Sequence, residues 1–576
     1  MSKKFSLPGY FPVLDWGRRY SRVNLVNDSV AGLIVAIMLV PQSLAYALVA
    51  GLPAEMGLYA SIFGLTVYAV FGTSNSLSVA PVAVLSLMTS AALGSLALPS
   101  SADYIAAALT LSFLSGVFLL LLGLLRLGFM ANFISHPVVS AFITASAIII
   151  GLSQLKYLLG IETSGTNAVE LLDSLFASIG NTNFLTLGLG LGSIGIIVWC
   201  RTGLKKLLTG LGLEVRLVAA IARSGPLLVV FIVTMLAYLF RLDQQGVQLL
   251  GVVPKGLPGL ALPKLSLDLV SSLMGSAVLL AIIGFVESIS VGQTLAARRR
   301  ERIDLDQELV GLGAANIATS FGGGFPVSGG FSRSVVNFEA GASTPAAGFI
   351  TAAMLLVVAL FLTPVLFWLP KVSLAAIILV AIYSLVDFSV LGKSWRYSKA
   401  DFIAVFLTLV LTLTIGVETG IGAGVAASIL IHLYKTSQPH VAVVGRVDGT
   451  EHFRNIDRHK VETFDNLLSV RIDESLYFAN TRYLEELIFG LVADKPVLEH
   501  VILMCTAVNQ IDLSALETLE KINETLGELN IKLHLSEVKG PIMDSLSGTN
   551  FFRSITGNNY LSHNQAVEDL KDGAKS

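Results

Sequence analysis

The stretch FPVSGGFSRSVVNFEAGA, from Phe325 to Ala342, places one arginine among glycines and serines, between two long apolar regions. Within a membrane, an irregular backbone of this kind is tolerated only where it is buried in protein or lines a cavity. An arginine near the centre of a membrane helix costs about 2.5 to 3.5 kcal/mol. The stretch therefore predicts a broken membrane helix whose Arg333 faces protein or water.

The composition is that of a membrane protein. Of the 576 residues, 54% are hydrophobic and 14% are charged, and the mean hydropathy is +0.74. These values lie far outside the range of soluble globular proteins. The net charge of −2, with basic residues spread along loops, argues against a nucleic-acid partner. Two cysteines, Cys200 and Cys505, allow neither a disulfide framework nor a metal cluster, and we expect no cofactor.

Apolar segments follow one another from Ser29 to about Lys435, which leaves room for roughly twelve to fourteen of them. We expect full spans near 29–50, 104–125, 138–155, 184–200, 225–240, 270–296, 345–368, 373–390, 400–416 and 420–436. Shorter segments are expected near 56–71, 80–97, 307–321 and 332–340.

Lysine and arginine concentrate in alternate loops, which by the positive-inside rule face the cytoplasm together with both termini. These residues are Lys3, Lys4, Arg18, Arg19, Arg22, Arg201, Lys205, Lys206, Arg216, the run ARRRER from Ala297, Lys393, Arg396 and Lys399. The loop 161–181 is acidic and fits the outside. The N-terminus lacks the pattern of a cleavable signal, so we expect a multi-pass protein of the plasma (inner) membrane that keeps its first span.

The chain divides into four parts by composition. We expect a cytoplasmic N-terminal segment at 1–28, a transmembrane domain at 29–436, a linker at 437–463 and a soluble α/β domain at 464–576. In the last part, LLSVRI (467–472), HVILMC (500–505) and KLHLSE (532–537) predict strands, and 514–530 predicts a helix.

The two halves of the membrane region show a weak internal symmetry. SNSLSVAPVAVLSLM (74–88) and FPVSGGFSRSVV occupy matching places, each after a long span and shorter segments. Paired interrupted segments of this kind indicate a transporter site built by inverted repeats. Each break is expected to begin a half-helix, and two such N-termini near mid-membrane would form a cradle for an anion.

Four polar residues are candidates for this site besides Ser332. Arg333 would bind the anion; its alternatives are to snorkel to an interface or to pair with an acid such as Glu339. Glu287 lies midway along an apolar span and shares a helical face with Ser290 and Thr294. It is either a proton carrier or the counter-charge of Arg333. Gln42 and Tyr46, on one face after Pro41, would donate to the substrate or pack against a helix.

Four parts of the chain closely resemble the sulfate permease (SulP) family of anion transporters. They are PQSLAYALVAGLPAEMGLYASIFG (41–64), GTSNSLSVAPVAVLSL (72–87), ELVGLGAANIATSFGGGFPVSGGFSRSVVNFEAGA (308–342) and the C-terminal α/β domain. The resemblance implies a polytopic helical fold of about fourteen segments in two inverted repeats of seven, divided into core and gate. It also implies a cytoplasmic STAS domain, a homodimer and a cytoplasmic regulator that binds the STAS domain.

The resemblance assigns roles to particular residues. It implies that Gln42, Tyr46, Val82, Ser332 and Arg333 contact the substrate and that Glu287 is a coupling carboxyl. In the α/β domain, NQIDLSALETL (509–519) is similar to a loop that is phosphorylated in related bacterial domains. Leu513 and Ala515 depart from that motif, and we expect Ser514 to be a helix N-cap completed by Glu517.

Our hypothesis is therefore secondary active uptake of an inorganic anion, sulfate first, coupled to protons by alternating access. The alternatives are sodium-coupled bicarbonate symport, C4-dicarboxylate transport and chloride or anion exchange; an anion channel of the same fold is a different class. Enzyme activity is not expected, because FGGGFPVSGG lacks the lysine and hydroxyl residue of a phosphate-binding loop.

Overall fold

The computed structural model describes residues 11–571 except 97, 130–134, 211–224, 253, 255, 257 and 258. Lys3, Lys4 and Arg216, which contribute to the expected topology, lie outside the described residues. Contacts divide the chain into two units, Met1–Ser428 and Ile429–Ser576.

The first unit is helical. Its first half contains α2 (Val13–Trp16), α3 (Arg22–Val49), α4 (Glu55–Phe71), β1 (Val79–Ala80), α5 (Ala83–Gly94), α6 (Ser101–Leu124), α7 (His136–Leu159), α8 (Ala168–Ser178), α9 (Phe184–Trp199), α10 (Lys205–Gly210) and α12 (Gly225–Phe240). Its second half contains α13 (Leu267–Arg299), α14 (Leu305–Phe321), β2 (Ser328–Gly329), α15 (Phe331–Glu339), α16 (Ala346–Val357), α17 (Thr363–Leu366), α18 (Lys371–Ile382), α19 (Ser389–Tyr397), α20 (Lys399–Thr414) and α21 (Val417–Ser437).

The predicted membrane segments correspond to helices of this structure. Eight helices are long and apolar enough to cross a membrane, counted over the described part of the chain. Two of these eight contain an irregular turn: Ala346–Leu366 has a π-helical turn at Val358–Leu362, and Lys371–Tyr397 has a break after Ile382, where α18 ends. The loop expected at 161–181 contains α8, which Asn167 caps by accepting from the amide of Glu170.

The internal symmetry is confirmed by the order of the elements. A long helix (α3 or α13), a 17-residue helix (α4 or α14), a two-residue strand and a short helix (α5 or α15) follow one another in each half. α5 and α15 have 12 and 9 residues, too few to cross a bilayer, which takes about 20. The two strands pair antiparallel, with Val79 opposite Gly329 and Ala80 opposite Ser328.

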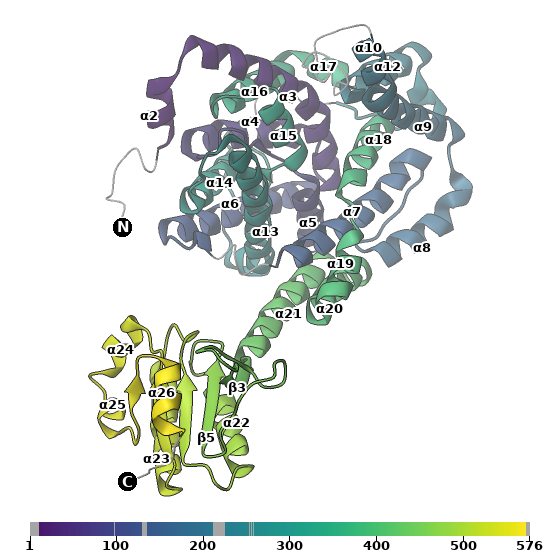
Figure 1. The fold of residues 1–576 in the computed structure, drawn as a ribbon. Helices are drawn as coiled ribbons and strands as arrows, with labels where there is room; N and C mark the ends of the chain where they lie inside the picture. Colours follow the sequence, from purple (N-terminus) through teal and green to yellow (C-terminus); the bar gives the residue numbers. More distant parts are fainter. Residues whose placement is uncertain are drawn as a thin grey trace. The chain divides into compact units, whose positions relative to one another are not determined.

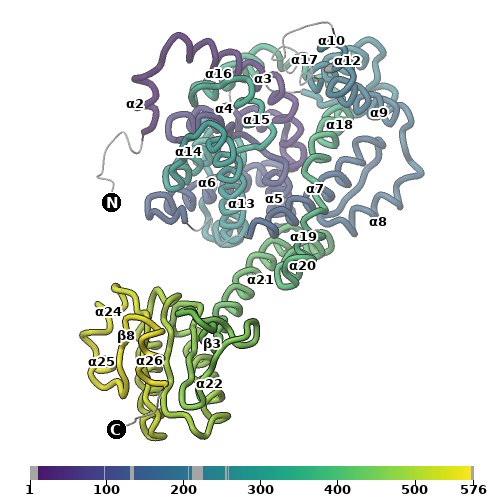
Figure 2. Tube along the Cα trace, viewed as in Figure 1, coloured from purple at the N-terminus to yellow at the C-terminus, as the bar shows by residue number. Residues whose placement is uncertain are grey.

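The helices pack in two groups, which are visible in Figures 1 and 2. In the core group, α14 packs against α4 and α6, and α16 packs against α3 and α4; in the gate group, α18 packs against α7 and α9, and α20 against α7. Small residues allow the closest approach of the core helices. A Cβ at Gly313 of α14 would lie 2.6 Å from the amide nitrogen of Leu120 on α6.

The second unit has one six-stranded sheet with the order β4-β3-β5-β6-β7-β8. The strands are β3 (Val441–Arg446), β4 (Phe453–Asn455), β5 (Leu467–Ile472), β6 (His500–Met504), β7 (Lys532–Ser536) and β8 (Asn559–Tyr560). β5 to β8 are parallel, whereas β3 pairs antiparallel with both of its neighbours. The helices are α22 (Thr481–Ala493), α23 (Leu513–Glu528), α24 (Gly540–Leu546), α25 (Asn550–Ser554) and α26 (His563–Leu570).

The sequence locates the three central strands and α23 of this unit within one or two residues. β3 and β4, however, lie within 437–463, the stretch expected to be a linker, and they extend the sheet. The expected N-cap Ser514 is also wrong. The N-cap of α23 is Asp512, which accepts from the amide of Ala515, so Ser514 lies inside the first turn.

Candidate anion-binding site

The two backbone breaks meet at the short pair of strands. β1 leads to Val82, the N-cap of α5, and β2 leads to Gly330, the N-cap of α15. β2 is also held to α13, because Ser328 Oγ donates to the carbonyl of Gly284 at 2.8 Å. Gly330 leaves room for the Arg333 side chain: a Cβ there would lie 2.7 Å from Nη2 of Arg333, so the guanidinium would have to shift. The break therefore allows the Arg333 side chain to fold back over it.

Arg333 is the third residue of α15 and is only 3% exposed. Its Nη1 donates to the carbonyl oxygen of Pro81 at 2.7 Å, and its Nη2 donates to that of Ala80 at 3.1 Å. Nε is buried without a hydrogen-bond partner among the described residues. The guanidinium thus lies between the two half-helix starts instead of reaching an interface.

The other predicted contact residues lie around this point. Tyr46 is buried on α3, close enough to Arg333 and Glu287 for an electrostatic interaction with both. Gln42 is buried one turn before Tyr46. Val82 directly follows Pro81, whose carbonyl binds Arg333.

A cavity of about 350 Å³ lies between core and gate elements. Glu287, Ser290 and Gln293 of α13 and Phe331, the first residue of α15, line it on the core side; His136, Val139, Ser140 and Ile143 of α7 line it on the gate side. Ser332, next to Phe331, is exposed. Oε2 of Glu287 has no hydrogen-bond partner among the described residues. Thr294, expected on the same helical face as Glu287, donates to the carbonyl of Ser290 within α13 and is not among the lining residues.

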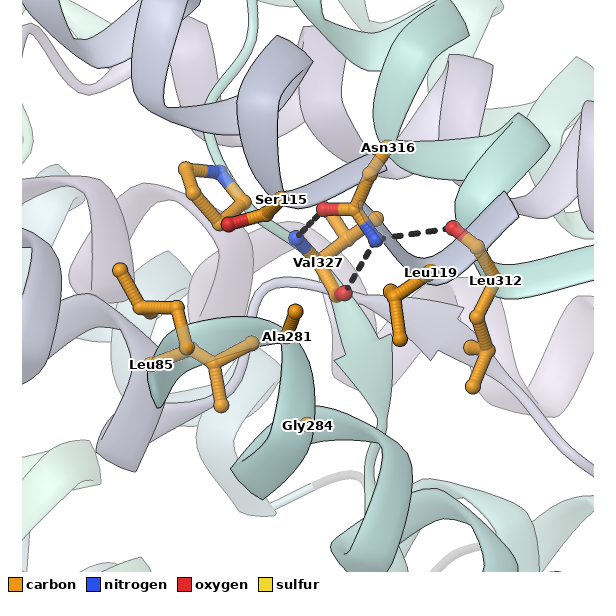
Figure 3. Close-up of a pocket in the computed structure, with 10 residues that line it drawn as sticks. Leu85, Ser115, Leu119, Ala281, Gly284, Leu312, Asn316 and Val327 are labelled. Atoms are coloured by element: carbon orange, nitrogen blue, oxygen red, sulfur yellow. Dashed lines mark hydrogen bonds between the residues drawn. The ribbon is translucent and has the colours of Figure 1, made fainter. Parts of the chain in front are cut away.

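A second, much smaller hollow of about 10 Å³ lies beside the β2 break (Figure 3). Asn316 of α14 accepts from the amide of Val327 and donates to the carbonyls of Val327 and Leu312. Ser115 of α6 donates to the carbonyl of Ala277. A hollow of this size holds about one water at most, and its polar groups are already bonded. It is part of the packing that shapes the break and has no room for a substrate.

Three buried polar residues that matter for the site were not singled out from the sequence. Asn316 holds the break before β2, as described above. Asp28 of α3 accepts from the amides of Ser343 and Thr344, in the loop after α15. Glu308 of α14 accepts four hydrogen bonds from the end of α4 and the segment before β1. A polar residue within an apolar helix is the sequence signal that all three share.

The sequence matches known protein families along most of its length. Residues 25–408 match the Sulfate permease family. The chain belongs to the sulfate permease family. Residues 458–566 match the STAS domain, so both parts of the resemblance are confirmed. Membership of this family makes the chain a membrane transporter and not an enzyme.

Two plant members of the sulfate permease family illustrate the similarity. Probable sulfate transporter 4.2 of Arabidopsis thaliana is 36% identical over 551 residues, covering 93% of this chain and 80% of that protein. High affinity sulfate transporter 2 of Stylosanthes hamata is 31% identical over 569 residues, covering 95% and 84%.

Solved structures show the same fold. Murine Solute Carrier 26 family member A9, an anion transporter in the inward-facing state, superposes with a TM-score of 0.89 at 23% identity, covering 99% of this chain and 95% of that chain. The transmembrane domain of the cyanobacterial bicarbonate transporter BicA superposes with a TM-score of 0.60 at 23% identity, covering 70% and 98%. This sulfate permease family member therefore has the expected polytopic fold of core, gate and STAS domain.

Proposed function

We propose that this chain is a secondary active transporter that takes up an inorganic anion, sulfate first, in symport with protons. The observation that carries the proposal is the buried guanidinium of Arg333 between the starts of α5 and α15. Arg333 is not among the residues that line the cavity of about 350 Å³, but Glu287, with which it interacts electrostatically, and Phe331, two positions earlier, are. A cavity of this size is typical of small-molecule sites. The names of the plant relatives support sulfate as the first anion to test.

Electrostatics favours an anion at this place over a cation. Arg333 donates to two neutral carbonyls, which do not neutralise its charge, and its Nε has no hydrogen-bond partner among the described residues. The N-termini of α5 and α15 add a partial positive charge, each worth about 0.3 to 2 kcal/mol to a bound anion. Gln42, Tyr46, Val82 and Ser332 would complete the contact surface around the anion.

Glu287 gives the site a means of coupling. When Glu287 is ionised, its negative charge attracts Arg333 and weakens the binding of a substrate anion. When Glu287 is protonated, it is neutral, and the charge of Arg333 can bind the anion. The position of Glu287 on the cavity wall lets a proton reach it from water. Coupling is needed, because moving a divalent anion inward against a membrane potential of 100 mV takes roughly 4.6 kcal/mol of electrical work. One proton that enters with the anion offsets about half of this work.

The placement of the cavity fits alternating access. It lies between α13 and α15 of the core and α7 of the gate, close to the end of α13 that carries the ARRRER run. The positive-inside rule favours the cytoplasm for this end, which supports the proposal that the cavity belongs to the inward side of the transport cycle. Movement of the core against the gate would then close this cavity and open one on the other side.

Uptake into proteoliposomes tests the proposal. The purified full chain would be reconstituted, and labelled sulfate, bicarbonate, succinate and chloride would each be offered under an imposed proton or sodium gradient. We expect sulfate uptake that an inward proton gradient drives uphill. Sulfate uptake that does not depend on the proton gradient would overturn the proposed proton coupling. Bicarbonate uptake driven by sodium, without sulfate uptake, would show that the substrate is bicarbonate. Flux that follows voltage alone would make the chain an anion channel.

We also infer from the family that the chain forms a homodimer in the plasma membrane, with both termini in the cytoplasm and the STAS domain available to a regulator. Light scattering of the detergent-solubilised protein measures whether the chain forms a dimer. A monomer at all protein concentrations would contradict it.

A further inference from the structure

Glu308, in the first turn of α14, is 1% exposed and accepts four hydrogen bonds. Tyr68 donates its hydroxyl to Oε2 at 2.7 Å. The amide and hydroxyl of Thr73 donate to Oε1 at 2.7 and 2.5 Å, and the amide of Ser74 donates to Oε1 at 3.1 Å. All four partners are donors, so the site requires an acceptor at both oxygens, which a carboxylate provides.

The segment that Glu308 holds continues to the anion site. Beyond Ser74, the carbonyl of Ser76 accepts from Nδ2 of Asn337 at 3.1 Å, and the amide of Ser78 donates to Oγ of Ser334 at 3.0 Å. Both partners lie on α15. The segment then forms β1 and ends at Ala80 and Pro81, whose carbonyls bind Arg333. A bonded path of main chain thus joins Glu308 to the guanidinium.

We propose that Glu308 is a positioning residue for the anion site: by fixing Thr73 and Ser74, it sets the place of the Ala80 and Pro81 carbonyls and hence of the Arg333 guanidinium. The segment is short and is bonded to α15 at Ser76 and Ser78, so a shift of its anchored end is passed along the chain and through α15 to Arg333. A misplacement of about 1 Å at a binding group is enough to weaken the function of a site substantially.

The two buried carboxyl groups of the core therefore differ in role. Glu287 lines the cavity, and one of its oxygens has no partner among the described residues. Glu308 is enclosed, and both of its oxygens are bonded. Glu287 can exchange a proton with water in the cavity, whereas protonation of Glu308 would place a hydrogen against one of its donors. This assignment rests on the proposed function, because it acts through Arg333 as the anion-binding group.

Four variants of the full chain test the positioning role. Glu308→Gln replaces one acceptor by a donor. Thr73→Val removes only the hydroxyl bond, and Thr73→Ser retains it. We expect Glu308→Gln and Thr73→Val to raise the KM for sulfate, roughly threefold to thirtyfold, with a smaller change in kcat per folded transporter. Thr73→Ser should remain near wild type. Asp306→Asn is the matched control, because Asp306 lies on the same turn of α14 but binds the amide of Gly128, outside this segment.

The measurements are sulfate uptake into proteoliposomes and the sulfate concentration that half-maximally stabilises the detergent-solubilised protein against heat. In an Arg333→Lys background, Glu308→Gln should add no further increase in KM, since the group that it positions is already changed. Asp306→Asn should lower the unfolding temperature and leave the KM unchanged.

Several outcomes separate this proposal from the proposed function. If Arg333→Lys raises the KM but Glu308→Gln and Thr73→Val leave it unchanged, the positioning role is overturned and the anion site stands. If Arg333→Lys leaves the KM unchanged, the anion site and the positioning role are both overturned. If Glu308→Gln does not fold, the comparison of Thr73→Val with Thr73→Ser decides.

Discussion

Arg333 donates a hydrogen bond from Nη1 to the carbonyl oxygen of Pro81 at 2.7 Å, although 252 positions separate the two residues in the chain. The arginine belongs to the second repeat and the proline to the first. The bond therefore joins the two halves where their helices are broken. Because a carbonyl accepts a hydrogen bond without cancelling the charge, Arg333 remains the cation that the proposed anion site requires.

The first prediction concerns this charge. Arg333→Ala should weaken sulfate binding by at least about tenfold, because it removes the charge and leaves the Ala80 and Pro81 carbonyls without donors. Arg333→Lys keeps the charge but loses the planar fork, so an intermediate loss is expected. Sulfate binding would be measured by calorimetry on the detergent-solubilised protein. Unchanged affinity in a folded Arg333→Ala protein would return this residue to a structural role.

The second prediction concerns coupling. Glu287→Gln mimics the protonated acid permanently, so it should still bind sulfate and exchange it across the membrane. It should no longer accumulate sulfate under an inward proton gradient, since the side chain carries no transferable proton. Counterflow and gradient-driven uptake in the same proteoliposomes separate the two activities. Gradient-driven accumulation at the wild-type level in Glu287→Gln would contradict the proposal.

The broken helices could be predicted from the sequence because glycine and proline interrupt apolar runs at matching places. The acceptors of Arg333 could not, because they are backbone carbonyls and carry no side-chain signature. α8 was missed because a short helix between two spans has no membrane-spanning length. Asp512 and Ser514 are both good N-caps by residue type, and only the backbone geometry shows that the helix begins after Asp512.

The third prediction concerns the close contact of α6 and α14. Gly313→Ala should destabilise the membrane unit, because the new Cβ would lie 2.6 Å from the amide nitrogen of Leu120 and 2.8 Å from the carbonyl oxygen of Gly116. Both contacts are backbone atoms, which cannot move aside cheaply. Gly275→Ala on α13 is the control, since nothing lies within 4 Å of its added Cβ. Thermal unfolding of the solubilised proteins measures the difference, and equal unfolding temperatures would contradict this account of the packing.

The fourth prediction tests the corrected start of α23. Asp512 accepts from the amide of Ala515 through Oδ1 and from the amide of Phe478 through Oδ2. Asp512→Ala should therefore destabilise the soluble unit by about 1 to 2 kcal/mol. Ser514→Ala should change its stability by less than about 0.5 kcal/mol, as for an exposed surface position. Hydrogen exchange of α23 in the full chain provides the measurement. A larger loss of protection in Ser514→Ala than in Asp512→Ala would restore Ser514 as the cap.

The fifth prediction concerns two buried histidines of the soluble unit. His534 accepts from the amide of Asn558 through Nδ1, and its Nε2 lies 3.2 Å from Nδ1 of His500. His563 contacts the hydroxyls of Ser536 and Ser469. Burial lowers the pKa of both His534 and His563 from 6.5 to about 4; for His534, the nearby His500 and Lys532 act in the same direction.

The sign of the pH dependence follows from these shifts. Between pH 6.5 and about 4 the unfolded chain binds more protons at these two rings than the folded one. The free energy of unfolding of the soluble unit should therefore be highest above pH 6.5 and fall as the pH drops toward 4. His534→Gln keeps an acceptor and a donor but cannot titrate, so its decline should be shallower than that of the wild type. Hydrogen exchange of β6 and β7 in the full chain, corrected for the intrinsic effect of pH on exchange, measures how stability falls with pH in the wild type and in His534→Gln. A wild-type protection that stays constant from pH 7.5 to 4.5 would show that neither ring is held neutral by the fold.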